Sequence, residues 1–143
     1  MTIPTQMSLH GFIATAPQLN FAGSGVARFY ARVGVEHYRK ETDGSFTKLD
    51  STFHDMVAFS KTAERAYTRF KVGDRFVASG FINQYELERN GRIEAREEFV
   101  ARRLGHDMAR TRYEVDRTSA HQPEPPGADL SAAAKEPAQG VGL

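Results

Sequence analysis

The sequence predicts a small all-β barrel with one short helix. Apolar residues alternate with polar ones in several stretches between Ser8 and Leu104, which is the period of half-buried strands. A helical period appears only once, in the stretch that follows Phe59. The chain of 143 residues suits one domain with a tail.

Two strands are expected in the first 35 residues. The stretch "SLHGFIAT" reads as a first strand, and "APQL" reads as the turn after it. The second strand, 26–35, has the cleanest alternation of the chain. One of its faces is apolar and consists of Ala27, Phe29, Ala31, Val33 and Val35. The opposite face carries Val26, Arg28, Tyr30, Arg32 and Gly34.

The third strand, 52–59, is apolar on both faces, although a strand needs only one face against a core. It follows the polar loop "KETDGSF", which has a turn signal at Asp43-Gly44. If Met56 and Ala58 pack inward, Phe53 and Phe59 lie outside the barrel. If Phe53, Val57 and Phe59 form the core face instead, His54 and Met56 lie outside. Hydrophobicity alone leaves both interpretations open.

A helix is expected directly after this strand. Ser60 is a suitable N-cap, with Glu64 in the first turn. The residues at positions 63, 66, 67 and 70 share one apolar helix face, and Gly73 ends the helix.

Two further strands follow the helix. The fourth is "DRFVASGFINQYELER", in which Gly80 indicates a bulge or a tight bend. Asn90-Gly91 indicates a hairpin turn into the fifth strand, "RIEAREEFVARRL". Five strands with one helix between the third and the fourth is the order of the OB-fold, a Greek-key barrel. Another small closed barrel and an α+β sandwich are the alternatives.

Residues 118–143 are expected to form a disordered tail rich in Pro, Ala and Gly, after a domain that spans residues 1–117. The tail has no aromatic residue and too little apolar surface to offset its ordering entropy. The tail carries a net charge of −2. Because the whole chain carries +1, residues 1–117 carry a net charge of +3. This mild basic bias is compatible with an anionic partner.

The row Arg28, Tyr30 and Arg32 suits single-stranded nucleic acid. Aromatic rings stack on bases, and arginines contact phosphates or stack themselves. The alternative is an ordinary solvated strand face on which the arginines have no ligand.

Four segments in order resemble the DNA-binding domain of bacterial single-stranded DNA-binding proteins (the SSB family) over residues 7 to about 110. They are "LHGFIATAPQL", "GSGVARFYARV", "STFHDMVAFSKTAERA" and "FKVGDRFVASGFI". The ending "LGHDMAR" is similar to that of actinobacterial members. The resemblance implies a cytoplasmic, nucleoid-associated protein that coats and protects single-stranded DNA in replication, recombination and repair. It also implies a homotetramer, with a homodimer as the alternative.

The resemblance also implies roles for single residues. Phe53 and Phe59 stand at positions where the family stacks aromatic side chains on bases, and Tyr38 falls near another. His54 matches a histidine at the family's subunit interface. We expect Tyr30 to stack on bases together with these rings. We expect Arg28 and Arg32 to contact phosphate. We also expect phosphate contacts from three neighbouring cations outside this row, Lys48, Lys61 and Arg75.

Several departures from the family pattern weaken the expected binding. Other residues stand at the positions where the family has tryptophan, and Leu87 stands at the third of these positions. Asp55 stands where a cation is common, and Glu86 and Glu88 add negative charge on the last hairpin. The end "QGVGL" lacks the family's acidic, Phe-terminated tip, so we do not expect recruitment of repair or replication enzymes through it. A secondary paralogue, or a plasmid- or phage-encoded version, would fit both losses.

Other functions fit the sequence less well. None of the five histidines has zinc-site spacing, and there is no cysteine, so we expect neither a metal nor a cofactor. We expect no enzyme, because no nucleophile is placed beside a base, and no membrane segment, because no apolar run reaches about 20 residues. Lack of cysteine agrees with a cytoplasmic location. An OB-fold module that binds RNA or replication proteins is one alternative, and a protein-interaction module with an aromatic interface is the other.

Overall fold

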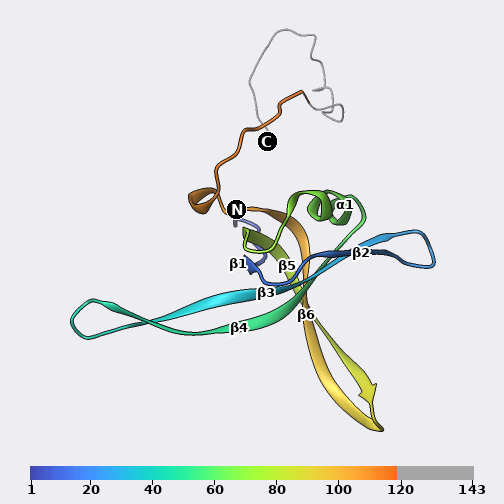
Figure 1. Cartoon of the computed structure of the whole chain (residues 1–143), viewed down its shortest axis with the longest axis horizontal. Coiled ribbons are helices and arrows are strands. Elements are labelled where there is room, and N and C mark those ends of the chain that lie inside the picture. The colour runs from blue at the N-terminus through green and yellow to red at the C-terminus, as the bar shows by residue number, and fades with distance from the viewer. Residues whose placement is uncertain (119–143) are drawn as a thin grey trace. The chain divides into compact units, whose positions relative to one another are not determined.

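Six strands, one α-helix and one short 3-10 helix follow one another in the computed structural model, which describes residues 1–118 (Figure 1). They are β1 (Met7–Ile13), β2 (Gln18–Phe21), β3 (Ala27–Lys40), β4 (Phe46–Phe59), α1 (Ser60–Arg69), β5 (Arg75–Arg89), β6 (Arg92–His106) and η1 (Met108–Arg110). These elements lie in one unit, Met1–Arg112, and residues 113–118 carry no helix or strand. The predicted disorder of the tail concerns residues that, from 119 onward, lie outside the described part.

Five of the strands close into a barrel. The strand order is β1-β5-β6-β4-β3-β2, and an additional pairing of β1 with β3 completes the ring. The pairing of β4 with β6 is parallel, and every other pairing is antiparallel. The predicted all-β OB-fold, with its helix between the third and fourth barrel strands, is therefore confirmed.

The barrel is filled by one face of each strand. Phe29, Ala31 and Val33 are fully buried, as the alternation of this strand predicts, and Phe76 of β5 meets them in the core. The helix closes one end of the barrel through Ala63 and Ala66, and Phe70 follows directly after it. Burial of each large side chain contributes roughly 1.5–3 kcal/mol, so this alternation fixes which face of each strand points outward.

Two hairpins extend beyond the barrel (Figure 1). In the first, β3 and β4 stay paired as far as Lys40 and Phe46, so both strands are longer than the predicted 26–35 and 52–59. Apolar and polar residues alternate only weakly in this stretch, so the sequence pattern does not reveal it. Backbone hydrogen bonds between the two strands hold the pairing. In the second hairpin, Asn90 and Gly91 have φ values of 55° and 76°, which confirms the predicted tight turn.

A bulge interrupts the pairing of β5 with β6 where Gly80 predicts an irregularity. Ser79 pairs with Arg103 and Gly80 pairs with Ala101, which leaves Arg102 as the extra residue of β6. A Cβ atom on Gly80 would lie 1.9 Å from the carbonyl oxygen of Val100. Glycine is therefore required here by the close approach of the two backbones.

The structure corrects three local predictions. Gln18 and Leu19, read as part of the turn "APQL", belong to β2, because residues 18–21 pair with Ala27–Tyr30 of β3 at the edge of the sheet. Ser60 is the first helical residue, with a φ of 59°, and Phe59 occupies the N-cap position with no side-chain hydrogen bond. The helix ends at Arg69, and Gly73, with a φ of 93°, lies in the turn after it. Among the described residues, no helix is long and apolar enough to cross a membrane.

Candidate nucleic-acid interface

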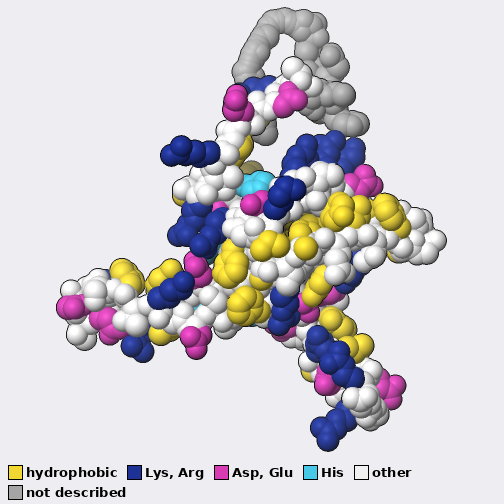
Figure 2. All heavy atoms as spheres, viewed as in Figure 1, with side chains coloured by type: hydrophobic (Ala, Val, Ile, Leu, Met, Phe, Trp, Pro, Cys, Tyr) yellow, Lys and Arg dark blue, Asp and Glu magenta, His cyan; other side chains and the backbone are white. Residues whose placement is uncertain are grey.

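The outer surface of β3 and β4 gathers aromatic rings and guanidinium groups on one side of the barrel. We call it the aromatic face and define it by Arg28, Tyr30, Arg32, Phe53 and Phe59. In the sheet, Arg28 lies opposite Phe59, and Arg32 lies opposite Asp55. Figure 2 shows hydrophobic side chains at the surface over this part of β3 and β4.

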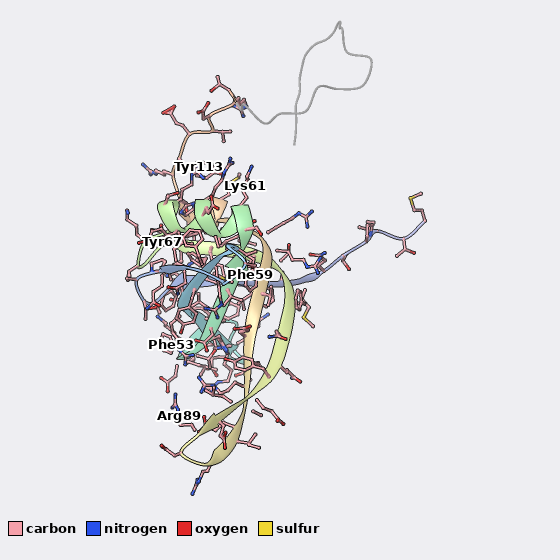
Figure 3. The ribbon with its side chains drawn as sticks, turned by 90° about the vertical axis from the view of Figure 1, so that its right-hand side faces the viewer. Phe53, Phe59, Lys61, Tyr67, Arg89 and Tyr113 are labelled. Atoms are coloured by element: carbon pink, nitrogen blue, oxygen red, sulfur yellow. The ribbon has the colours of Figure 1, made fainter. Side chains whose placement is uncertain are left out.

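The rings of Phe53 and Phe59 lie outside the barrel. Their exposed fractions are 47% and 41%, whereas Met56 and Ala58 are fully buried in the core. Strand alternation therefore places Phe53 and Phe59 on the side of β4 away from Met56 and Ala58. Val57 lies on the same side as the two rings but is fully buried. Figure 3 shows Phe59 between Phe53 and the helix that carries Lys61. Both rings are accessible for stacking.

Neighbouring side chains hold the ring of Phe53 in place. The ring of Phe12 meets it edge to face, with the two centroids 6.3 Å apart. Phe12 can lie there because it covers Gly34, where an added Cβ atom would be 2.2 Å from the ring. The guanidinium of Arg75 lies 5.4 Å from the centroid of Phe12, at cation–π distance. Phe53 therefore offers a pre-oriented surface.

Asp55 lies in the middle of the aromatic face and binds two of its members. The Tyr30 hydroxyl donates a hydrogen bond to the Asp55 carboxylate at 2.7 Å, and Arg32 Nη1 donates another at 2.9 Å. Burial raises the pKa of this carboxyl, but the hydrogen bonds from Tyr30 and Arg32, together with the positive charges of Arg32 and Arg96, outweigh it and leave the pKa below its usual range. Burial and the bond to Asp55 raise the pKa of Tyr30.

The second arginine of the row also has an acidic partner. Arg28 Nη2 lies 3.6 Å from the Glu98 carboxylate of β6, which accepts a hydrogen bond from Asn83 at 3.1 Å. Both arginines that the sequence singles out are thus paired on the free protein. A phosphate that binds either of them must compete with a carboxylate.

Three more of the predicted residues lie around Glu36, where the first hairpin leaves the barrel. Arg75 Nη1 donates to Glu36 at 2.7 Å, and Lys48 Nζ lies 3.4 Å from the same carboxylate. The hydrogen bond from Arg75 lowers the pKa of Glu36, and Glu36 in turn raises the pKa of Arg75. Tyr38, which is 54% exposed, lies opposite Lys48 in the hairpin.

The structure does not bring Lys61 and His54 into the aromatic face. Lys61 is exposed in the first turn of α1. His54 points to the other side of β4 from Phe53 by alternation, and its Nε2 lies 2.8 Å from the Thr52 hydroxyl. The same hydroxyl lies 2.8 Å from Nε2 of His37.

Sequence reasoning missed two residues that border the aromatic face. Phe81 of β5 is 40% exposed, and the Arg102 guanidinium lies 5.2 Å from its ring centroid. Both line a shallow pocket together with Phe59, Asn83 and Glu98. The alternation after Phe76 places Phe81 outward and could have found it. Arg102 is the bulge residue of β6, and no sequence pattern indicates which residue a bulge leaves over.

No metal centre is apparent within residues 1–118, since no group of three or more His, Asp or Glu side chains lies close enough together to hold an ion. The chemistry that these residues offer is therefore stacking, hydrogen bonding and ion pairing.

Comparisons with known proteins agree with the fold. A small single-stranded DNA-binding protein from Streptomyces coelicolor matches with a TM-score of 0.61 at 22% identity, over 76% of this chain and 100% of that chain. A deletion mutant of the single-stranded DNA-binding protein from Thermus aquaticus matches with a TM-score of 0.60 at 14% identity, over 72% of this chain and 50% of that chain. No curated protein matches the sequence. The model of the single-strand binding protein family matches residues 4–107, and the chain belongs to this family.

Proposed function

We propose that this protein binds single-stranded DNA, without sequence preference, through the aromatic face. Membership of the single-strand binding protein family supports the ligand. The observation that carries the site is the exposure of Phe53 and Phe59 beside guanidinium groups on one strand pair. Coating of this kind keeps strands unpaired and protected during replication, recombination and repair, and requires no catalytic step.

Stacking supplies most of the affinity on this face. Every base has a π-face, so Phe53, Phe59 and Tyr30 accept any base, at roughly 1–3 kcal/mol for each stacked base. Tyr38 extends the row of rings along the first hairpin. Stacking involves no base-specific hydrogen bonds, and this explains the absence of sequence preference.

The ion pairs of the free protein set the electrostatic contribution. Arg32 is bound to Asp55, and Arg28 lies beside Glu98, so a bound phosphate gains less from either arginine than from an unpaired one. We therefore infer weaker binding than in family members whose face carries tryptophan and unopposed cations. Lys48 and Arg75 share Glu36 and contribute in the same reduced way.

Assembly is a further part of the proposal. We infer a homotetramer that works at the nucleoid in the cytoplasm, with a homodimer as the alternative. The family pattern supports this inference through His54, whose side chain lies on the opposite side of β4 from Phe53 and leaves the aromatic face free.

Fluorescence anisotropy with labelled oligo-dT at low and at moderate salt tests the proposal. We expect binding at low salt that weakens as salt rises, because phosphate contacts release counterions. An affinity for an RNA oligomer equal to that for oligo-dT would point to the RNA-binding alternative. No binding at either salt concentration would contradict the proposal and favour a protein-interaction surface.

A further inference from the structure

A second basic surface lies between α1 and β6, outside the aromatic face. It is a groove of about 490 Å³, which we call the α1–β6 groove. Five cationic side chains line it, namely Lys61, Arg65, Arg69, Arg102 and Arg103. No Asp or Glu lines it, and within residues 1–118 none of the five cations forms an ion pair. Figure 2 shows Lys and Arg side chains gathered beside α1.

The helix places three of these cations in a row at a cost to its own stability. Lys61, Arg65 and Arg69 follow one another at intervals of four residues, which is about 6 Å along a helix. Like charges at this spacing repel each other. Lys61 in the first turn also opposes the helix dipole, whereas Arg69 in the last turn interacts favourably with it. A row of repelling charges with no acidic partner is the arrangement that a polyanionic ligand would stabilise.

Two aromatic rings of the groove lining contact each other. The ring of Phe70 stacks on the ring of His106, with centroids 4.2 Å apart, and His106 Nε2 lies 3.2 Å from the Asp74 carboxylate. This contact links the end of α1 to the end of β6, the two elements that carry the five cations.

Arg102 joins the groove to the aromatic face. It lines the groove, and it also lines the pocket formed with Phe59 and Phe81. As the extra residue of the bulge, Arg102 departs from the regular alternation of β6, and bulges commonly re-aim a side chain in this way. Phe59 is also separated from Lys61 by a single residue, so the two surfaces are contiguous (Figure 3).

We propose that the α1–β6 groove binds the phosphate backbone of the single strand that stacks on the aromatic face. This inference rests on the proposed function and divides the work between two surfaces. The aromatic face, where the arginines are already paired, supplies stacking. The groove, where the cations are unpaired, supplies most of the electrostatic attraction, and Arg102 marks the point where the strand passes from one surface to the other.

The double variant Arg65→Ala/Arg69→Ala tests this division. Both residues are exposed and alanine favours a helix, so the fold should persist, as thermal unfolding would verify. Oligo-dT of about 5 and of about 16 nucleotides spans the range of site sizes known for OB-folds. We expect the longer oligomer to bind about 25-fold more weakly at 0.1 M salt, with a salt slope smaller by roughly 1.4, because two phosphate contacts are lost. We expect the short oligomer, held by stacking, to bind as before.

A matched control removes the same charge elsewhere. Arg110→Ala/Arg112→Ala changes two exposed residues that follow β6 and line neither the groove nor the pocket beside the aromatic face. Equal losses in the two double variants, or unchanged binding of the longer oligomer by the groove variant, would overturn the inference. Failure of the wild-type protein to bind either oligomer would instead refute the proposed function itself.

Discussion

Phe53 is an exposed ring on the outer side of β4. Replacement by alanine in Phe53→Ala should weaken oligo-dT binding by about 1–3 kcal/mol, because one stacking surface is lost. Phe21→Ala is the matched control, since Phe21 is 62% exposed on β2, outside the aromatic face. Anisotropy titration gives the affinities. Loss of the folded state in Phe53→Ala, or an equal loss of affinity in the control, would show that the ring has another role.

Asp55 restrains the arginine that lies beside it. Asp55→Asn should strengthen DNA binding about fivefold at 0.1 M salt and raise the salt slope by about 0.7, because Arg32 gains one phosphate contact. An asparagine oxygen can still accept the hydrogen bond from Tyr30. Asp50→Asn, an exposed change of the same charge on β4, serves as the control. Unchanged affinity in Asp55→Asn would mean that Arg32 does not contact phosphate.

The same carboxylate gives the protein a defined response to acid. The pKa of Asp55 is lower in the folded state than in the unfolded chain, so its stabilising effect is present above about pH 4. That effect is lost as the pH falls through the lowered pKa. Urea unfolding at pH 6 and pH 3 should therefore show a smaller loss of stability for Asp55→Asn than for the wild-type protein. Parallel losses would exclude Asp55 as a source of acid sensitivity.

Gly80 controls the junction of β5 and β6. Gly80→Ala places a Cβ atom against the Val100 carbonyl, which a rigid backbone cannot avoid, and should destabilise the fold by about 1–3 kcal/mol. Gly105→Ala on β6 meets nothing within 4 Å and should shift stability by no more than about 0.5 kcal/mol. Urea midpoints compare the two variants, and similar midpoints would contradict the requirement for glycine at position 80.

Elements were predictable from sequence where burial imposes a period. The face of β3 with Phe29 and Val33 was assigned correctly, because a shift by one residue would expose it. Strand β4 was ambiguous, since both of its faces are apolar, and the family resemblance decided between them. The partner of Arg28 was not predictable, because Glu98 lies on a strand that pairs in parallel with β4 across a long separation in sequence.

Assembly belongs to the scale of the whole molecule. We expect native mass spectrometry to give four times the chain mass of 15.9 kDa, and titration with poly-dT to saturate at a fixed number of nucleotides per tetramer. A mass of two chains would support the homodimer. A single chain that still binds oligo-dT would refute assembly and leave the aromatic face intact as a proposal.

The irregular pairing between Val35 and His37 divides one continuous hairpin into two stretches. The inner stretch holds Arg28 and Arg32 in phase with the barrel, and the outer stretch carries Tyr38. Insertion of residues in pairs near the tip would lengthen the outer stretch. The alternation of side chains between the two faces of the inner stretch would stay the same. Evolution or a protein designer could therefore tune how much polymer each subunit spans without rebuilding the platform beneath it.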